Sequence, residues 1–288
     1  MIVVTYNIQY SLGKDGVHDI KRVVDEVRGA DIIALQEVSR HMATVPDFDQ
    51  PARIAELLPE YFWVYGPPVD MAAGLQRKKP IRDNRRLQFG NMLLSKWPIL
   101  SSRLLLLPRT RTYDKHNQQC GALEGIVDVP GGPLSFYCVH LNHLNGEERL
   151  RQLDYLLPLM MEVRLDGATV TGGDWNVITE VPIPDDYVML GDHNLLPDSD
   201  EYLRIVGRPD YFYGARISAR HLVDAWAQVG HSLDDGVTWY DGDNDWVPGG
   251  RLDYVFVSPS LAPHVKRAWI DNDAIGSDHQ PVWIELQR

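Results

Sequence analysis

The stretch that decides the fold runs from residue 3 to residue 38 and reads VVTYNIQYSLGKDGVHDIKRVVDEVRGADIIALQEV. Its first five residues, ending at Asn7, are mostly β-branched or aromatic and predict a strand. Apolar residues then recur with helical spacing over residues 17–27, and DIIALQEV returns to a strand. Because the two strands of such a unit end at the same edge of a sheet, we expect Asn7 and Glu37 to lie close together.

The rest of the chain repeats this alternation of strands and helices. Two sheets packed together with helices outside is the expected α/β architecture, within one domain over residues 1–288. Pro158 is expected to interrupt one of the helices. Further strands are predicted at 61–65, 89–95, 101–107, 121–129, 134–141, 251–257 and 281–286, and helices at 51–58, 147–164, 202–206 and 221–229.

Composition and charge limit the class of protein. The chain has 288 residues, of which 44% are hydrophobic, and a net charge of −12, so no long-range field attracts it to nucleic acid. A nucleic-acid partner remains possible, because residues 76–86 hold six Lys or Arg. No membrane segment or secretory signal is recognisable, so a cytoplasmic location is expected, and Cys120 and Cys138 are expected to be buried free thiols.

Polar residues stand where several predicted strands end. They are Asn7, Glu37, His140, an Asp-x-Asn, Asp253, Asp278 and His279. Singly, each of them suits a turn or a helix cap. Together, their carboxylate and amide oxygens suit a hard divalent ion such as Mg²⁺ or Mn²⁺, and the histidines suit stabilisation of a charged phosphate.

Seven short motifs spread over nearly the whole chain point to one family. The chain resembles the endonuclease/exonuclease/phosphatase superfamily of metal-dependent phosphohydrolases, and the motifs follow that family's order. The resemblance implies a four-layered α/β sandwich with two mixed central β-sheets flanked by helices. The motifs are TYNI (5–8), LQEV (35–38), GNMLLSKWPI (90–99), VHLNHL (139–144), Gly-Asp-x-Asn, RLDYVFVS (251–258) and SDHQPVW (277–283).

The Gly-Asp-x-Asn motif occurs twice, as GGDWN (172–176) and LGDHN (190–194). After the second copy, LLPDSDEYLRIVG is similar to the segment that follows this motif in many bacterial members. Spacing favours the first copy, since Asp174 follows His140 by 34 residues and Asp192 by 52. Loops tolerate insertions at little entropic cost, so we favour Asp192 and Asn194, with Asp174 and Asn176 as the alternative.

The resemblance also implies a role for each site residue. Glu37 is the main metal ligand with Asn7 beside it, and Asp278 adds a contact. Asp192 orients and deprotonates the attacking water, and Asn194 donates its amide to the phosphate. His279, held protonated by Asp253, stabilises the transition state, and His140 supplies a second donor. His143, in the same VHLNHL motif, is expected to be structural.

The substrate is less constrained than the reaction. Abasic-site endonucleases usually carry tyrosine at the position of His140, and the PAWCDR-like segment of inositol 5-phosphatases is mostly missing from residues 247–256. A small-molecule or lipid head-group phosphodiester or phosphomonoester is favoured. A nuclease acting on DNA or RNA and a non-catalytic binding scaffold are the alternatives. Aromatic residues at 211–214 and 238–246 are candidates for a stacking wall or for core.

Overall fold

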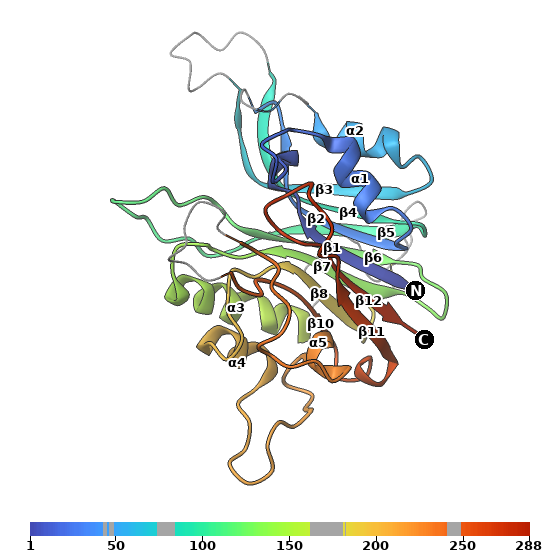
Figure 1. Ribbon diagram of the computed structural model, residues 1–288, viewed down its shortest axis with the longest axis vertical. Coiled ribbons are helices and arrows are strands. Elements are labelled where there is room, and N and C mark those ends of the chain that lie inside the picture. Colours follow the sequence, from blue (N-terminus) through green and yellow to red (C-terminus); the bar gives the residue numbers. More distant parts are fainter. Residues whose placement is uncertain (43–44, 46–48, 74–83, 162–180, 182, 241–248) are drawn as a thin grey trace, which may run out of the picture.

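The computed structural model describes residues 1–42, 45, 49–73, 84–161, 181, 183–240 and 249–288. Two six-stranded sheets lie face to face (Figure 1). The first sheet has the order β11-β12-β1-β2-β4-β3, with β1 Ile2–Asn7, β2 Ile32–Arg40, β3 Phe62–Ala72, β4 Arg86–Ser95, β11 Val265–Ile270 and β12 Val282–Leu286. The second has the order β5-β6-β7-β8-β10-β9, with β5 Ile99–Leu106, β6 Gly121–Val127, β7 Leu134–His140, β8 Tyr187–Asp192, β9 Val223–Asp224 and β10 Asp253–Val257.

Both sheets are mixed. In the first, β1 and β2 are parallel and β1 is antiparallel to β12. In the second, β7 and β8 are parallel and β8 is antiparallel to β10. The short 3-10 helices η1 (Gln9–Ser11) and η3 (Ala262–His264) follow β1 and precede β11.

Helices cover the outer faces of both sheets, which gives the four layers (Figure 1). The buried face of α1 (Ile20–Val27) packs with α2 (Gln50–Leu57) against the outer side of the first sheet. On the other side, α3 (Gly146–Met161) and α4 (Asp200–Val206) cover the second sheet. The short α5 (Ala225–Gln228) packs against β10 and β11. This arrangement confirms the predicted α/β sandwich.

The core between the sheets becomes polar toward one end. Alternate residues of each central strand point inward. Over most of their length these residues form a continuous apolar cluster that includes Ala34, Phe136 and Val255. At one end of the sheets, the next inward position of each strand, two residues along, carries a polar side chain. The inward polar positions are Asn7 and Gln36 in the first sheet and His140, Asp192 and Asp253 in the second.

Several element predictions need correction. Pro158 lies inside α3 and does not interrupt it, because flanking side chains such as Leu157 and Leu159 are buried against the sheet. Residues 221–229 are not one helix but β9 followed by α5. β3 runs well beyond the predicted residues 61–65. Its two prolines lie in a register shift between Gly66 and Val69, where the strand can continue without their ladder hydrogen bonds. β11 was not predicted.

Two sequence expectations concern single features. Cys120 and Cys138 are buried free thiols, as predicted, and burial raises the pKa of each to about 12. None of the described helices is long and apolar enough to span a membrane. Most of the basic stretch 76–86 lies outside the described residues.

Candidate active site

Three site residues form a row across the second sheet. The register pairs His140 with Asp192 across the parallel strands and Asp192 with Asp253 across the antiparallel ones. Gly191 makes this row possible, because its φ is 148° and a Cβ there would meet the Val139 carbonyl oxygen at 1.9 Å. Any larger residue before Asp192 would push β8 away from β7.

The first sheet contributes Asn7 and Glu37. Glu37 has a φ of 61° and lies where the pairing of β2 with β4 shifts between Leu35 and Val38. Asn7 Nδ2 donates to Glu37 Oε1 at 3.3 Å and to Asp192 Oδ2 at 2.9 Å, so it links the two sheets. Burial raises the pKa of Glu37 to about 7, and the positive His279 and the Asn7 hydrogen bond partly oppose it.

The side-chain amide of Asn7 is held in one orientation. Its Oδ1 accepts a hydrogen bond from the Gln9 backbone amide at 3.1 Å, so the side-chain nitrogen faces the carboxylates. This amide therefore positions the carboxylates of Glu37 and Asp192 by donating to both, and a metal contact of Asn7 stays a prediction.

His279 and Asp253 form a buried ion pair. Asp253 Oδ2 lies 2.8 Å from His279 Nδ1, and His279 Nε2 lies 3.8 Å from Asp192 Oδ2. Burial alone lowers the pKa of His279, but Asp253 and Asp192 outweigh it and raise that pKa to about 10. The Thr238 hydroxyl oxygen accepts from the Asp253 backbone amide at 3.1 Å, which fixes the start of β10.

His140 has the opposite protonation state. Its Nε2 lies 3.6 Å from Asp192 Oδ2. In the row across the second sheet, His140 and Asp253 lie on opposite sides of Asp192. Burial, with His279 and His143 adding to it, lowers the pKa of His140 to about 3. Asp192 thus lies between a neutral and a positively charged imidazole.

Asp192 and Asn194 are held by local backbone geometry. Asn194 has a φ of 51°, which turns its backbone amide onto Asp192 Oδ1 at 2.9 Å. Its side-chain Nδ2 donates to the Leu141 carbonyl oxygen at 3.1 Å and leaves a second hydrogen on that nitrogen. Burial raises the pKa of Asp192, as its carboxylate is removed from water. The alternative pair, Asp174 and Asn176, lies outside the described residues.

Asp278 is positioned by Gln9, which the sequence did not single out, and by Trp239 of the aromatic stretch 238–246. Its Oδ2 accepts from Gln9 Nε2 at 3.0 Å and from Trp239 Nε1 at 3.2 Å. Gln9 directly follows the TYNI motif and has a φ of 42°. No residue pattern in the sequence indicates this left-handed backbone conformation.

The carboxylates and histidines of the site differ in how well they suit a divalent cation. The described residues include one group of three potential ligands whose donor atoms lie within 4.8 Å of one another, namely Asp192, Asp253 and His279. This group is a charge network rather than a metal site, because a protonated imidazole has no lone pair to offer. Glu37 fits a hard cation better, since Asn7 is its only hydrogen-bond donor among the described residues and burial disfavours its charge. Asp278 beside the same cleft supplies further oxygens.

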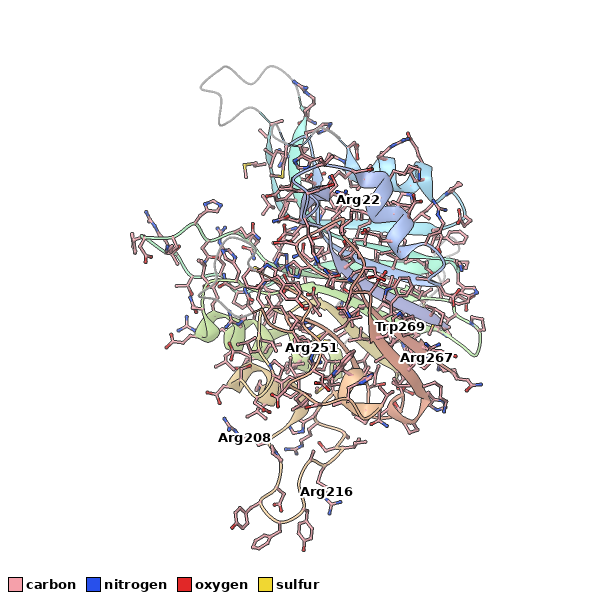
Figure 2. All side chains as sticks on the ribbon, viewed as in Figure 1. Arg22, Arg208, Arg216, Arg251, Arg267 and Trp269 are labelled. Carbon is pink, nitrogen blue, oxygen red and sulfur yellow. The ribbon has the colours of Figure 1, made fainter. Side chains whose placement is uncertain are left out.

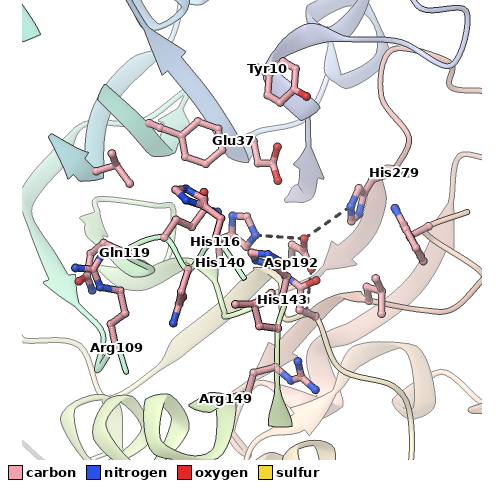
Figure 3. Close-up of a pocket in the computed structure, with 18 of the residues that line it drawn as sticks. Tyr10, Glu37, Arg109, His116, Gln119, His140, His143, Arg149, Asp192 and His279 are labelled. Carbon is pink, nitrogen blue, oxygen red and sulfur yellow. Dashed lines mark hydrogen bonds and ion pairs between the residues drawn. The ribbon is translucent and has the colours of Figure 1, made fainter. Parts of the chain in front are cut away.

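These residues lie at a cleft of about 1000 Å³ (Figure 3). Glu37, His140, Asp192, Asp278 and His279 line it, as does Asn194, whereas Asn7 and Asp253 lie behind them. His143, expected to be structural, also lines the cleft.

The aromatic residues at 211–214 form neither the stacking wall nor the core that the sequence analysis allowed. Tyr211, Phe212 and Tyr213 are 92%, 81% and 71% exposed and do not line the cleft. Figure 2 shows their segment, marked by Arg216, projecting away from the sheets. Trp239 does line the cleft, and residues 241–246 of the second aromatic stretch lie outside the described residues.

The two-sheet α/β fold and a cleft lined by carboxylates and histidines together indicate the class of this protein. The chain belongs to the Endonuclease/Exonuclease/phosphatase family, whose model matches residues 4–279. Members of this family hydrolyse phosphoesters and depend on a divalent metal. No curated protein sequence matches the chain.

Solved structures share the fold. An endonuclease/exonuclease/phosphatase from Beutenbergia cavernae is 24% identical, with a TM-score of 0.66 over 100% of this chain and 71% of that one. A mannosyl-6-phosphatase from Bacteroides thetaiotaomicron is 17% identical, with a TM-score of 0.64 over 100% of both chains. D. rerio TDP2, complexed with a single-strand DNA product, is 18% identical, with a TM-score of 0.62 over 100% of this chain and 99% of that one.

Proposed function

We propose that this chain hydrolyses a small-molecule or lipid head-group phosphodiester or phosphomonoester by in-line attack of water, with Mg²⁺ or Mn²⁺. The observation that carries the proposal is the setting of Asp192 between neutral His140 and protonated His279, beside Glu37 in an open cleft. A carboxylate, a neutral imidazole and an imidazolium provide a base, a hydrogen-bond donor and a positive charge at one place.

The attacking water is assigned to Asp192. One carboxylate oxygen is held by Asn7 and the other by the Asn194 backbone amide, so the side chain has a single orientation. Burial raises the pKa of Asp192 and makes it a stronger base toward a bound water than an exposed aspartate. Asn194 uses its remaining amide hydrogen for a phosphate oxygen.

The charged phosphate is assigned to the two histidines. His279 donates from Nε2 and carries a positive charge that Asp253 maintains through Nδ1. His140 donates as a neutral imidazole. Glu37 and Asp278 would hold the divalent cation, which when bound supplies Lewis-acid stabilisation of the phosphate oxygens. Asn7 orients Glu37 and Asp192.

The test is hydrolysis of bis(p-nitrophenyl) phosphate and p-nitrophenyl phosphate with Mg²⁺, Mn²⁺ or EDTA. We expect turnover that EDTA and Asp192→Ala abolish, and a preference for one ester that narrows the substrate class. Asp174→Ala is the matched control, because it changes the same residue type in the same short motif. A dead Asp174→Ala and an active Asp192→Ala would assign the chemistry to the first copy, and absence of turnover with either metal and either ester would contradict the proposal.

A further inference from the structure

The cleft has a second group of polar side chains away from the catalytic centre. Arg109, His116 and Gln119 come from the segment between β5 and β6, and His143 follows β7. Figure 3 shows Arg109 and Gln119 across the cleft from His279, with His116 and His143 between them. The proposed hydrolysis uses none of these four residues.

Three of these side chains have donors to spare. Arg109, His116 and His143 make no hydrogen bond or ion pair with another residue in the described part of the chain. Arg149, which also lines the cleft, is different, because it pairs with Glu201 at 2.8 Å. Burial lowers the pKa of His143, Asp192 partly opposes this, and His116 and Arg149 add to it, so His143 offers a ring N–H as a neutral imidazole.

A buried carboxylate holds this part of the cleft in place. Glu148 of α3 is 2% exposed and accepts from the Thr110 backbone amide at 2.9 Å, from Asn117 Nδ2 at 3.1 Å and from Asn142 Nδ2 at 2.9 Å. It therefore ties the segment that carries Arg109 and His116 to the turn that carries His143. One turn further along α3, Gln152 accepts a hydrogen bond from the Asn142 backbone amide and donates one to the Pro108 carbonyl oxygen. Buried polar anchors of this kind fix a geometry and distinguish the segment from a solvated loop.

Another part of the cleft lining is apolar. It is built from side chains of β3, β4 and the segment after β2, namely Met42, Val69, Met71, Leu87 and Phe89. A ligand in this cleft thus meets the candidate catalytic centre, a group of hydrogen-bond donors that includes Arg109, and an apolar surface.

We propose that Arg109, His116 and His143 form a subsite for a second phosphate group of the substrate. The inference rests on the proposed function, since it places this phosphate in the same cleft as the ester that is cleaved. Donors converging from two segments suit the three acceptor oxygens of a phosphate better than the planar pair of a carboxylate. The substrate class is then a small phosphoester that carries a second phosphate and an apolar portion.

The test uses ligands that differ only in the second group. Alkane-α,ω-diol bisphosphates from propane to hexane are compared with the alkyl monophosphate and the ω-phosphocarboxylate of the same length. Binding is measured by calorimetry with Mg²⁺ present and by competition with bis(p-nitrophenyl) phosphate hydrolysis. We expect at least one bisphosphate to bind about tenfold tighter than its monophosphate. Arg109→Gln should remove that advantage.

Arg111→Gln is the matched control. Arg111 is an arginine of the same segment, but it lies over the Tyr113 ring at 5.0 Å and does not line the cleft. Equal effects of the two variants, or no bisphosphate advantage at any length, would overturn the subsite. An equal advantage for the phosphocarboxylate would overturn its assignment to phosphate. A bisphosphate advantage in calorimetry that Arg109→Gln removes, in a protein that hydrolyses neither chromogenic ester, would support the subsite and refute the proposed function instead.

Discussion

Replacing Asp253 with asparagine tests whether this carboxylate keeps His279 charged. The substitution retains the shape of the side chain and removes the charge that lies 2.8 Å from His279 Nδ1. Burial lowers the pKa of His279, and Asp253 is the largest of the influences that raise it to about 10. Without Asp253, burial persists and the pKa falls from about 10 toward the ordinary 6.5 or below.

The size of the effect depends on pH. With a pKa of 6.5, only about 3% of His279 would be protonated at about pH 8, so turnover there should fall roughly 30-fold or more. In the proposed mechanism His279 acts in its protonated form, so activity should be lost as the pH rises through its pKa. The falling limb of the wild-type profile should therefore lie near pH 10, and that of Asp253→Asn near 6.5 or lower. The same pairing contributes stability that is fully present below the unfolded pKa and is lost as the pH rises through about 10.

The assay is kcat for the preferred chromogenic ester as a function of pH, with circular dichroism to check folding. Asp154→Asn is the control, because Asp154 lies on α3 with a 60% exposed side chain and should keep the wild-type profile. If folded Asp253→Asn has the same falling limb as the wild type, the pKa of His279 does not depend on Asp253 and the reasoning fails.

Two further predictions concern the metal and the stability of the second sheet. Glu37→Gln should raise the Mg²⁺ concentration for half-maximal turnover at least about tenfold, since it removes the carboxylate charge, and an unchanged metal titration would exclude Glu37 as a ligand. Arg251→Ala leaves buried Asp224 without its partner at 2.9 Å and should lower the free energy of unfolding in urea by about 3–5 kcal/mol. Arg267→Ala, which loses only a cation over the Trp269 ring, should change it by about 0.5 kcal/mol or less (both arginines are labelled in Figure 2), and equal losses would contradict the argument.

The sequence predicted the central elements better than the edges. β1, β2, β7 and β10 are buried on both faces, so their apolar runs are unmistakable. β11 has two exposed cations, Lys266 and Arg267, in its middle and lacks that pattern. The two residues of β9 pair only because β10 lies beside them. Such strands depend on tertiary partners that a single sequence does not display.

The positions of the candidate site residues were predictable, but their states were not. The period of two along buried strands places His140, Asp192 and Asp253 in one row. The second Gly-Asp-x-Asn copy was favoured because of the segment that follows it. In that segment Ser199 caps α4, since its hydroxyl accepts from the Tyr202 backbone amide at 3.2 Å. The opposite charges of His140 and His279 arise from burial and neighbours, which exist only in the folded chain.

The hydrogen bond from Asn7 to Asp192 joins side chains that belong to different sheets. Its length therefore measures the spacing between two layers, and that spacing is set by apolar side chains behind the site, such as Phe136 and Val255. Packed interiors transmit small changes in volume instead of absorbing them. Substitutions at those apolar positions would then change the distance between Asn7 and Asp192 even when every polar residue of the site is kept. The packing between the two sheets would in this way affect the geometry of the candidate site.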